Sequence, residues 1–276
     1  MKKILVTGGN GFIGGYLIKK LTGFYDIHVL DVETDITNEE NVRKKIYDVE
    51  PDVVFHFAGY IYSEDFLKAY RVNYLGTRNL ILSLGDINRF IFMSTAAVYG
   101  NIDVPFKESD KIRPNTIYSW SKACAEQLCI DELLKGKPFT IVRGSLVYGP
   151  QQKANLFIPV ALKSLYGCEM RISSNGEQTR DFLYIDDLCD ALIMLIRSNV
   201  NGILNIGSGQ EVELKKVIDL MERISGRKAN VVYDPKQREN DVCRYYLDID
   251  GVKSCLDWVP QMSLEDGLRK IIEYGK

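Results

Sequence analysis

Short apolar runs alternate with amphipathic segments along the first half of the chain. Residues 3–7, 27–30, 52–59 and 90–93 are runs rich in aliphatic, β-branched and aromatic residues, typical of strands covered on both faces. Segments with helical spacing of apolar residues lie between these runs. The alternation predicts an α/β fold built on a doubly wound parallel sheet, with ligands at the carboxyl ends of its strands.

Three helices can be placed between or after the strands of the first half. Thr37 and Glu40 suggest a capping box that opens a helix whose apolar face is Val42, Ile46 and Val49. A long helix is predicted over residues 63–84. We also expect a helix to begin near Tyr118, after the fourth strand.

The second half of the chain predicts a smaller lobe. Helical spacing covers residues 156–166, 185–196, 213–224 and 264–274, while residues 170–173, 181–184 and 231–233 are predicted as strands. Asn175-Gly176 is a turn signal between the first two of these strands. We expect residues 1–150 to form the sheet domain, with 185–210 returning to it. Residues 151–276 are expected to form mainly a C-terminal lobe that is interleaved with the sheet domain.

Composition excludes several classes of function. The chain has 276 residues, of which 46% are hydrophobic and 26% charged, so it can bury an ample core. A net charge of −2 gives no electrostatic case for binding nucleic acid or an acidic membrane. No apolar run approaches the roughly 20 residues that a membrane helix needs, and the N-terminal run ends too early for a signal peptide. We therefore expect a cytoplasmic protein.

The cysteines and histidines favour no metal site. Cysteine occurs at positions 124, 129, 168, 189, 243 and 255 without a C-x-x-C pair, and His28 and His56 are the only histidines. Buried, reduced thiols are the expected state. His56 lies inside the third apolar run, which predicts a packed strand residue rather than a catalyst.

A glycine-rich turn joins the first strand to the first helix. Gly8, Gly11 and Gly14 follow the strand at a spacing of G-x-x-G-x-x-G. Such glycines permit a tight turn, let the backbone approach a pyrophosphate, and let the helix pack on the strand. The N-terminus of the helix would face the phosphates, so the turn predicts a dinucleotide site.

Asp31 ends the second strand, about 20 residues beyond the glycines. A carboxylate there can bind the adenosine ribose hydroxyls, and it repels a 2′-phosphate. Because no arginine follows Asp31 directly, we expect NAD(H) to be preferred over NADP(H).

Tyr118 and Lys122 stand four residues apart, which places them on the same face of a helix. An ammonium beside the phenol should lower the pKa of the tyrosine and make it a proton donor and acceptor for a hydroxyl and carbonyl pair. The spacing alone is more often a solvated helix face. Thr95, at the carboxyl end of the fourth strand, adds a polar group where such a site is expected.

Taken in order, the motifs resemble the extended short-chain dehydrogenases/reductases of the NAD-dependent epimerase/dehydratase group, most of whose members act on nucleotide-linked sugars. The resemblance covers nearly the whole chain. It begins with the glycine turn, Asp31, Asp35-Ile36, His56-Phe57-Ala58-Gly59, Asn73 and Thr77, Ser94 to Gly100, and Tyr118 with Lys122. It continues with Arg143, Val147 to Pro150, Arg180-Asp181-Phe182, Asn205 to Gly209, Arg238 with Asp241, and Trp258 to Pro260.

The resemblance implies roles for individual residues. Tyr118 would exchange the proton, Thr95 would bond the sugar oxygen, and Lys122 would hold the nicotinamide ribose. Arg180 and Arg238 would meet the nucleotide diphosphate, and the substrate-binding set is Thr95, Tyr118, Arg180 and Arg238. The implied cofactor-binding set is Gly8, Gly11, Phe12, Ile13, Gly14, Asp31, Asp35, Ile36, Phe57, Ala58, Gly59, Asn73 and Lys122. The family also implies a homodimer through the helices near 63–84 and 118–135.

Departures from the family pattern guide the choice of reaction. Dehydratases carry Asp-Glu where this chain has Ala96 and Ala97, so dehydration is disfavoured. Many epimerases carry asparagine at the position where this chain has Leu146. The segment between Asp31 and Asp35 is also short. We therefore expect reduction of a nucleotide 4-keto-6-deoxy sugar, with a UDP-glucose 4-epimerase type of reaction as the alternative. A non-catalytic dinucleotide-binding module is the second alternative, although such proteins usually lose the tyrosine or the lysine.

Overall fold

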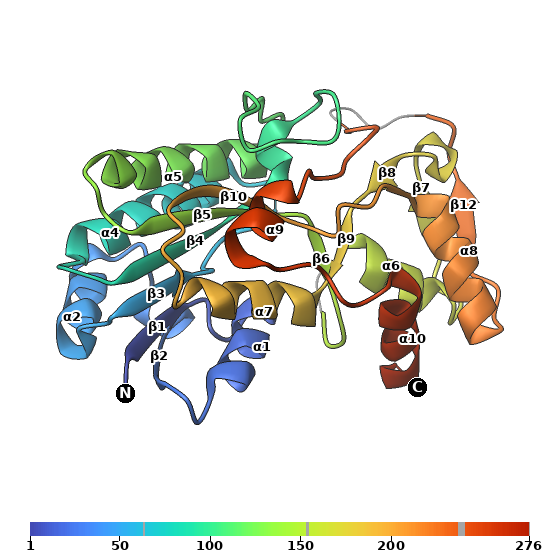
Figure 1. The fold of residues 1–276 in the computed structure, drawn as a ribbon. Coiled ribbons are helices and arrows are strands. Elements are labelled where there is room, and N and C mark those ends of the chain that lie inside the picture. The colour runs from blue at the N-terminus through green and yellow to red at the C-terminus, as the bar shows by residue number, and fades with distance from the viewer. Residues whose placement is uncertain (63, 153–154, 237–240, 276) are drawn as a thin grey trace.

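The computed structural model describes residues 1–62, 64–152, 155–236 and 241–275. Figure 1 shows a sheet covered by helices on both faces and a smaller lobe beside one end of it. Six strands form the sheet in the order β10-β5-β4-β3-β1-β2, and every neighbouring pair is parallel. They are β1 (Lys3–Thr7), β2 (Asp26–Leu30), β3 (Val53–His56), β4 (Arg89–Thr95), β5 (Phe139–Gly144) and β10 (Gly202–Ile206). The predicted doubly wound parallel sheet is confirmed.

The helices lie on the two faces as the strand alternation requires. On one face lie α1 (Phe12–Leu21) and α7 (Ile185–Leu195), and on the other α2 (Glu39–Val49), α4 (Gly76–Ser83) and α5 (Ile117–Leu134) (Figure 1). In β1, Ile4 and Val6 join the apolar core of the first face, whereas Leu5 joins that of the second. Successive side chains of a strand point to opposite faces, so a fully apolar strand serves both cores.

The predicted helix over 63–84 is divided in the structure. It begins at α3 (Phe66–Ala69), where the Asp65 side chain accepts a hydrogen bond from the Lys68 amide, and it passes through a π-helical stretch, η2 (Tyr70–Leu75), into α4. The predicted start was therefore too early, and residue 63 lies outside the described residues. A π-turn inside a helix often marks a functional position.

The predicted capping box at Thr37 was wrong. Asn38 caps α2 by accepting a hydrogen bond from the Asn41 amide, while Thr37 donates to the Asp35 carboxylate. The predicted apolar face of Val42, Ile46 and Val49 is correct, since all three are buried.

The smaller lobe is assembled from short elements that are distant in sequence. Parallel pairs join β6 (Leu146–Tyr148) to β9 (Phe182–Tyr184) and β7 (Met170–Ile172) to β12 (Val231–Tyr233). An antiparallel pair joins β8 (Thr179–Arg180) to β11 (Val212–Glu213). The strands on either side of Asn175-Gly176 are thus not paired with each other, and those residues lie in a 3₁₀ turn, η4 (Ser174–Gly176). The helices there are α6 (Phe157–Ser164), α8 (Leu214–Ser225) and α10 (Leu264–Tyr274), whereas α9 (Asp250–Leu256) packs on β10 and α7 of the sheet domain.

The chain returns from the lobe to the sheet through α7 and β10. Lys20 of α1 contacts Asp190 of α7 at 2.6 Å and Asp186 at 3.5 Å. β10 then adds to the edge of the sheet beside β5. These contacts fix α7 and β10 to the sheet domain, between two segments of the chain that belong to the lobe.

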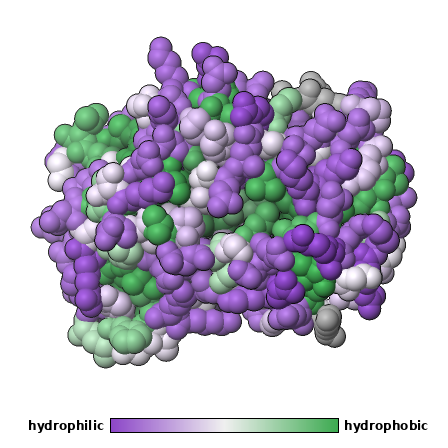
Figure 2. Space-filling view, turned by 45° about the vertical axis from the view of Figure 1, so that its right-hand side comes forward, coloured by the Kyte–Doolittle hydropathy of each residue, from purple (hydrophilic) through white to green (hydrophobic). Residues whose placement is uncertain are grey.

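The surface is mainly hydrophilic in the face shown in Figure 2, with apolar residues visible in its middle. Among the described residues, no helix combines the length and apolar character needed to cross a bilayer. All six cysteines are free thiols, but Cys168, Cys243 and Cys255 are exposed, so the expectation of buried thiols was wrong for these three.

Candidate active site

A cleft of about 1000 Å³ lies between the carboxyl edge of the sheet and the smaller lobe. From the sheet side it is lined by the glycine turn, the end of β4 and the start of α5. The lobe contributes residues around β6, the N-terminal end of α6, Arg180 and the segment from Asp241 to Tyr245. Pockets of this size accommodate large cofactors and substrates.

The glycine turn is packed against its own backbone. Gly8 has a φ of +67°, and a Cβ there would lie 2.8 Å from the backbone nitrogen of Ala58. A Cβ on Gly14 would lie 2.4 Å from the carbonyl oxygen of Gly8. Only glycine fits these two positions, so the close approach of turn, helix and strand is built into the sequence.

The N-terminus of α1 opens into the cleft. Its N-cap is Gly11, no side chain caps the helix, and its first turn contains no acidic residue. Phe12, Ile13 and Gly14 line the cleft beside it. An uncapped helix N-terminus with its positive partial charge suits an anionic group, so the residues present fit the pyrophosphate of a dinucleotide.

Asp31 lies at the end of β2, next to this turn. Its carboxylate accepts hydrogen bonds from the backbone amides of Asn10 at 2.6 Å and Val32 at 2.7 Å. It is only partly buried and caps a short 3₁₀ turn, η1 (Val32–Thr34). Asp31 does not itself line the cleft, but its carboxylate is fixed beside Asn10, which does.

The other residues of the implied cofactor set are divided between the cleft and the core. Phe57 and Gly59, which follow β3, line the cleft. The exposed Asp35 binds Thr37 through its carboxylate, and Ile36 is buried against Gly76. Neither of these two residues lines the cleft in the structure. Ala58 contributes its backbone amide, which donates to the Thr7 hydroxyl at 3.1 Å.

A buried chain of hydrogen bonds runs beneath the cleft. His56 Nδ1 contacts Thr7 Oγ1 at 2.6 Å, and His56 Nε2 contacts Thr77 Oγ1 at 2.8 Å. Thr77 in turn donates to the carbonyl oxygen of Asn73 at 2.6 Å. Burial and the nearby Lys122 charge hold the pKa of His56 well below its usual range, so the imidazole is neutral. His56 is a packed strand residue that ties β1 and β3 to the π-helical segment.

Asn73 is buried and is part of the hydrogen-bond chain beneath the cleft; its side chain does not line the cleft. Its Oδ1 accepts from the Tyr60 amide at 2.7 Å, and its Nδ2 donates to Ser121 Oγ at 2.8 Å. Ser121 lies on α5 between Tyr118 and Lys122. The side chain of Asn73 therefore fixes the helix that carries both predicted catalytic residues.

Thr95, Tyr118 and Lys122 converge in the cleft, although they come from two elements. Thr95 ends β4, and its hydroxyl accepts a hydrogen bond from the Ala97 amide at 3.1 Å, which caps the 3₁₀ turn η3 (Ala96–Tyr99). Tyr118 lies in the first turn of α5, just after the N-cap Thr116. Lys122 follows one turn later and is 4% exposed.

The predicted lowering of the Tyr118 pKa by Lys122 was wrong for the protein as it stands. Burial raises the pKa of Tyr118 to about 12, and a side-chain hydrogen bond with Thr95 offsets only part of that rise. Desolvation of the phenolate outweighs the effect of neighbouring groups. Burial likewise lowers the pKa of Lys122 to about 8, with Nζ lying 4.0 Å from the centroid of the Phe92 ring.

A buried ion pair lies one turn beyond Lys122 on α5. Arg143 of β5 holds the carboxylate of Glu126 through Nε at 3.1 Å and Nη2 at 2.7 Å, and Ser94 donates to the same carboxylate. Both charged side chains are almost fully buried. Pairing is what makes two buried charges tolerable, and it joins α5 to the end of the sheet.

Two arginines, Arg180 and Arg238, were predicted to bind the nucleotide diphosphate, and only the first lies among the described residues. Arg180 lines the cleft, where its guanidinium donates to Asp241 Oδ1 at 2.7 Å and to the carbonyl oxygens of Thr179 and Val242. The Arg180 guanidinium therefore joins β8 to the segment that contains Asp241 and Val242. Arg238 lies outside the described residues.

Several cleft residues were not identified from the sequence, among them Tyr245 and Ser145. Tyr245 comes from the segment between β12 and α9, and Ser145 follows Gly144 at the end of β5. The buried Ser145 hydroxyl has no hydrogen-bond partner among the described residues. Ser145 could have been suspected from its place after an apolar strand, whereas nothing in the local pattern marks Tyr245.

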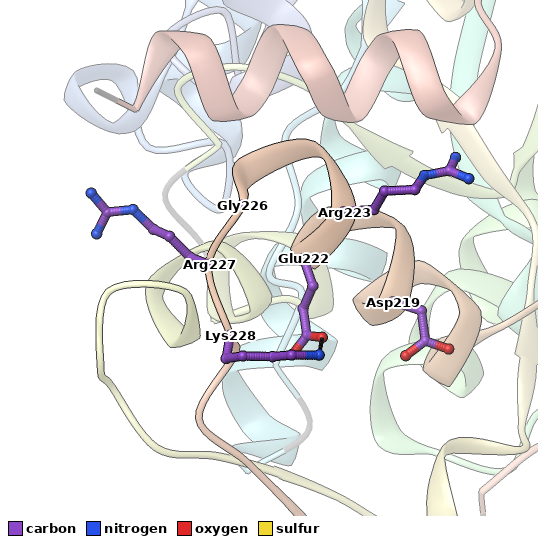
Figure 3. Close-up of a pocket in the computed structure, with 6 residues that line it drawn as sticks. All are labelled: Asp219, Glu222, Arg223, Gly226, Arg227 and Lys228. Atoms are coloured by element: carbon purple, nitrogen blue, oxygen red, sulfur yellow. Dashed lines mark hydrogen bonds and ion pairs between the residues drawn. The ribbon is translucent and has the colours of Figure 1, made fainter.

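A second hollow of about 430 Å³ lies at the C-terminal end of α8 (Figure 3). Lys228 and Glu222 form an ion pair across it, while the side chains of Arg223 and Arg227 extend away from each other (Figure 3). The charged groups are spread over a surface turn and do not converge on one point. The chemistry of the molecule is therefore sought in the large cleft.

Comparison with known proteins agrees with this geometry. A family model described as NAD dependent epimerase/dehydratase family matches residues 4–207. A putative UDP-glucose 4-epimerase of Methanocaldococcus jannaschii is 32% identical, over 99% of this chain and 98% of its own length.

Solved structures show the same fold over the whole chain. UDP-glucose 4-epimerase of Thermotoga maritima, solved with UDP-glucose, has a TM-score of 0.91 and 29% identity over 99% of this chain and 98% of its own. RMD from Pseudomonas aeruginosa, solved with NADPH, has a TM-score of 0.89 and 25% identity with the same coverage. The similarity therefore extends to the smaller lobe as well as to the sheet.

Proposed function

Since the chain belongs to the NAD dependent epimerase/dehydratase family, we propose that it transfers hydride at C4 of a nucleotide-linked hexose, most specifically in the reduction of a 4-keto-6-deoxy sugar. The convergence of Thr95, Tyr118 and Lys122 in the large cleft supports an enzyme rather than a non-catalytic binding module. The nucleotide-sugar ligand of a solved relative with similar structure supports the substrate class.

In this proposal Tyr118 gives its proton to the oxygen on the reacting carbon. The hydroxyl of Thr95 lies next to the Tyr118 phenol and can bond the same oxygen. Lys122 places a positive charge one turn below the phenol, where its ammonium can hold a ribose hydroxyl and stabilise the phenolate once the proton has left. The Glu126–Arg143 pair and Asn73 keep the helix in place.

The raised pKa of Tyr118 suits the role of proton donor in the proposed reduction. A phenol with a pKa near 12 is protonated at neutral pH, so it is ready to donate to a carbonyl oxygen. Because oxidation runs the same proton transfer in reverse, Tyr118 alone does not separate a reductase from an epimerase. Ala96 and Ala97 offer no acid or base for removing water, which argues against dehydration.

NAD(H) is the cofactor of this family, and when bound it supplies or accepts the hydride at C4. The glycine turn and the N-terminus of α1 would hold its pyrophosphate, and Asp31 its adenosine ribose. A preference for NAD(H) over NADP(H) is part of the proposal and is supported by the Asp31 carboxylate, which is fixed beside the glycine turn.

A 4-epimerase is the second candidate. It is supported by the relatives from Methanocaldococcus jannaschii and Thermotoga maritima, whose names are those of UDP-glucose 4-epimerases. An epimerase would use the same three residues but would regenerate its NAD⁺ in each cycle. The two candidates therefore differ in whether cofactor is consumed.

The deciding experiment measures the cofactor and the sugar together. Purified protein is analysed for bound dinucleotide and then given UDP-, dTDP- and GDP-linked 4-keto-6-deoxyglucose with NADH, or the matching glucose nucleotides without added cofactor. Oxidation of NADH that requires a 4-keto sugar supports the reductase. Retained NAD⁺ with conversion of a glucose nucleotide to its 4-epimer would replace it with the epimerase.

A homodimer is also part of the proposal. Apolar side chains lie exposed on neighbouring helices, with Leu67 64% and Trp120 43% exposed, and the Phe66 and Trp120 rings are 5.7 Å apart. Exposed patches that cross two helices are typical of association surfaces. Light scattering at micromolar concentration should give the mass of two chains, and a mass of one chain would contradict the homodimer.

A further inference from the structure

Lys122 has to carry its charge in surroundings that disfavour a charge. The side chain is 4% exposed, and Nζ lies 4.0 Å from the centroid of the Phe92 ring on β4. Among the residues that the structure describes, none forms an ion pair with the ammonium. Because burial favours the neutral amine, the ammonium that the proposed reaction uses needs a negative charge close by.

Glu126 carries such a charge one turn further along α5. Residues four apart lie on the same face of a helix, and Glu126, like Lys122, is buried on that face, at 1% exposure. Arg143 of β5 donates to the Glu126 carboxylate from Nε at 3.1 Å and from Nη2 at 2.7 Å, and Ser94 of β4 donates to Oε1. A carboxylate that a guanidinium binds through two nitrogens keeps its charge, and the three bonds fix where that charge lies.

The strand order places this carboxylate between two cations. In the sheet, β4 lies between β3 and β5, and β10 follows β5 at the edge. The ammonium of Lys122 lies over β4, whereas the carboxylate of Glu126 bonds side chains of β4 and β5. The guanidinium of Arg143 lies further toward β10, because it is 4.8 Å from the centroid of the Tyr99 ring, whose hydroxyl bonds Asn205 of β10 at 2.7 Å. Lys122 therefore faces the negative end of the ion pair.

The other titratable groups around Lys122 add no charge near neutral pH. His56 faces it from β3 and is neutral, because burial and the lysine charge hold the pKa of the imidazole well below its usual range. On α5, burial raises the pKa of the Tyr118 phenol and of the Cys129 thiol, so both stay protonated. Burial lowers the pKa of Lys122 to about 8, and the charge of Glu126 opposes that fall. Charges act strongly on each other where water is excluded, so this one carboxylate has a large effect.

We propose that Glu126 is a positioning residue whose carboxylate keeps the Lys122 ammonium charged beneath the phenol of Tyr118. The inference rests on the proposed function, in which that ammonium holds a ribose hydroxyl and stabilises the phenolate. Glu126 does not line the cleft, so it acts through Lys122 alone. Arg143 and Ser94 support the same role by holding the carboxylate in place.

The test follows the titration of Lys122 itself by NMR, in the purified chain carrying isotope-labelled lysine. The resonance of Lys122 is identified by its loss in Lys122→Arg. In the wild type the midpoint should lie near pH 8. In Glu126→Gln it should fall by roughly one to three pH units, the range that an opposite charge close to an ionisable group produces.

Glu132→Gln is the matched control, because Glu132 is a second buried carboxylate of α5 that is ion-paired, with Lys135. It lies ten residues beyond Lys122, about 15 Å along the helix, so its loss should leave the Lys122 midpoint near pH 8.

A double variant keeps the test valid if Glu126→Gln alone does not fold, since that change leaves the buried Arg143 without its partner. Glu126→Gln with Arg143→Met replaces the whole pair by uncharged side chains, and the Lys122 midpoint should fall there too, by less. A wild-type midpoint in the folded double variant, or an equal fall in Glu132→Gln, would overturn the inference and leave the proposed function intact. The proposed function fails separately, if the chain turns over no nucleotide sugar, and that result would leave these midpoints unchanged.

Discussion

The cofactor end and the substrate end of the cleft are built in different ways. At the cofactor end, β1, the glycine turn and the start of α1 follow one another within about a dozen residues. At the substrate end, Ser145, Arg180 and Tyr245 come from three segments separated by tens of residues. One end is encoded locally, whereas the other exists only after the lobe has folded onto the sheet.

This difference decides what holds each end in place. The glycine turn is fixed by steric limits, since a Cβ at Gly8 or Gly14 would meet backbone atoms. The substrate end is fixed by polar contacts such as Arg180 with Asp241 and Asp181 with Leu247. Steric limits within a short segment leave a sequence signature, and long-range polar contacts leave very little.

The largest effect is expected where the two ends meet, at Tyr118. Tyr118→Phe removes the proton donor and should lower turnover roughly 10²–10⁴-fold, with nearly unchanged dinucleotide affinity. Steady-state kinetics measures the turnover, and a fluorescence titration with NADH measures the dinucleotide affinity. Near-normal turnover would assign the proton to another group.

At the cofactor end, adding a single methyl group to the glycine turn should weaken NADH binding. Gly14→Ala places a Cβ 2.4 Å from the Gly8 carbonyl oxygen, so the turn has to shift and NADH affinity should fall about 10- to 100-fold, the range set by overpacking. Gly15→Ala is the matched control, since its Cβ would lie 3.7 Å from the Gly9 carbonyl oxygen. Equal affinities in the two variants would show that the turn does not depend on this contact.

Local patterns predicted most of the fold for the same reason that they predicted the glycine turn. The apolar face of α2 and the limits of β1 follow from periodicity alone. The pairing of β7 with β12 was not predictable, because the turn signal at Asn175-Gly176 describes only the local backbone. The cap at Asn38 was missed because Thr37, one residue earlier, is also a residue type that commonly caps helices.

The candidate site shows the same division. Thr95, Tyr118 and Lys122 could be named from the sequence, but the raised pKa of Tyr118 could not, since it depends on burial by residues far along the chain. Tyr245 was invisible for a related reason. Its position in the cleft depends on packing against Phe106, which is more than a hundred residues away in sequence.

Lys122 links the two ends electrostatically, and pH tests that link. With its pKa lowered to about 8, the ammonium is charged below pH 8 and neutral above it. NADH affinity should therefore fall as pH rises through 8, by up to about 10-fold per pH unit if the ribose contact needs the charge. Lys122→Arg should remove this step, because a guanidinium stays charged throughout. A step that persists in Lys122→Arg would assign the titration to another group.

The smallest effect, and the sharpest test of the cofactor end, concerns Asp31. Asp31→Ala removes the carboxylate that would bind ribose and repel a 2′-phosphate, so NADH should bind more weakly and NADPH more tightly. We expect the ratio of the two dissociation constants to shift about 10-fold, the scale of one charged contact near the surface. Glu33→Ala is the control, because it removes the same charge two residues away in η1. If both variants shift the ratio equally, the preference arises from the overall negative field at the rim. If only Asp31→Ala shifts it, the carboxylate reads the ribose by contact, as a locally encoded site requires.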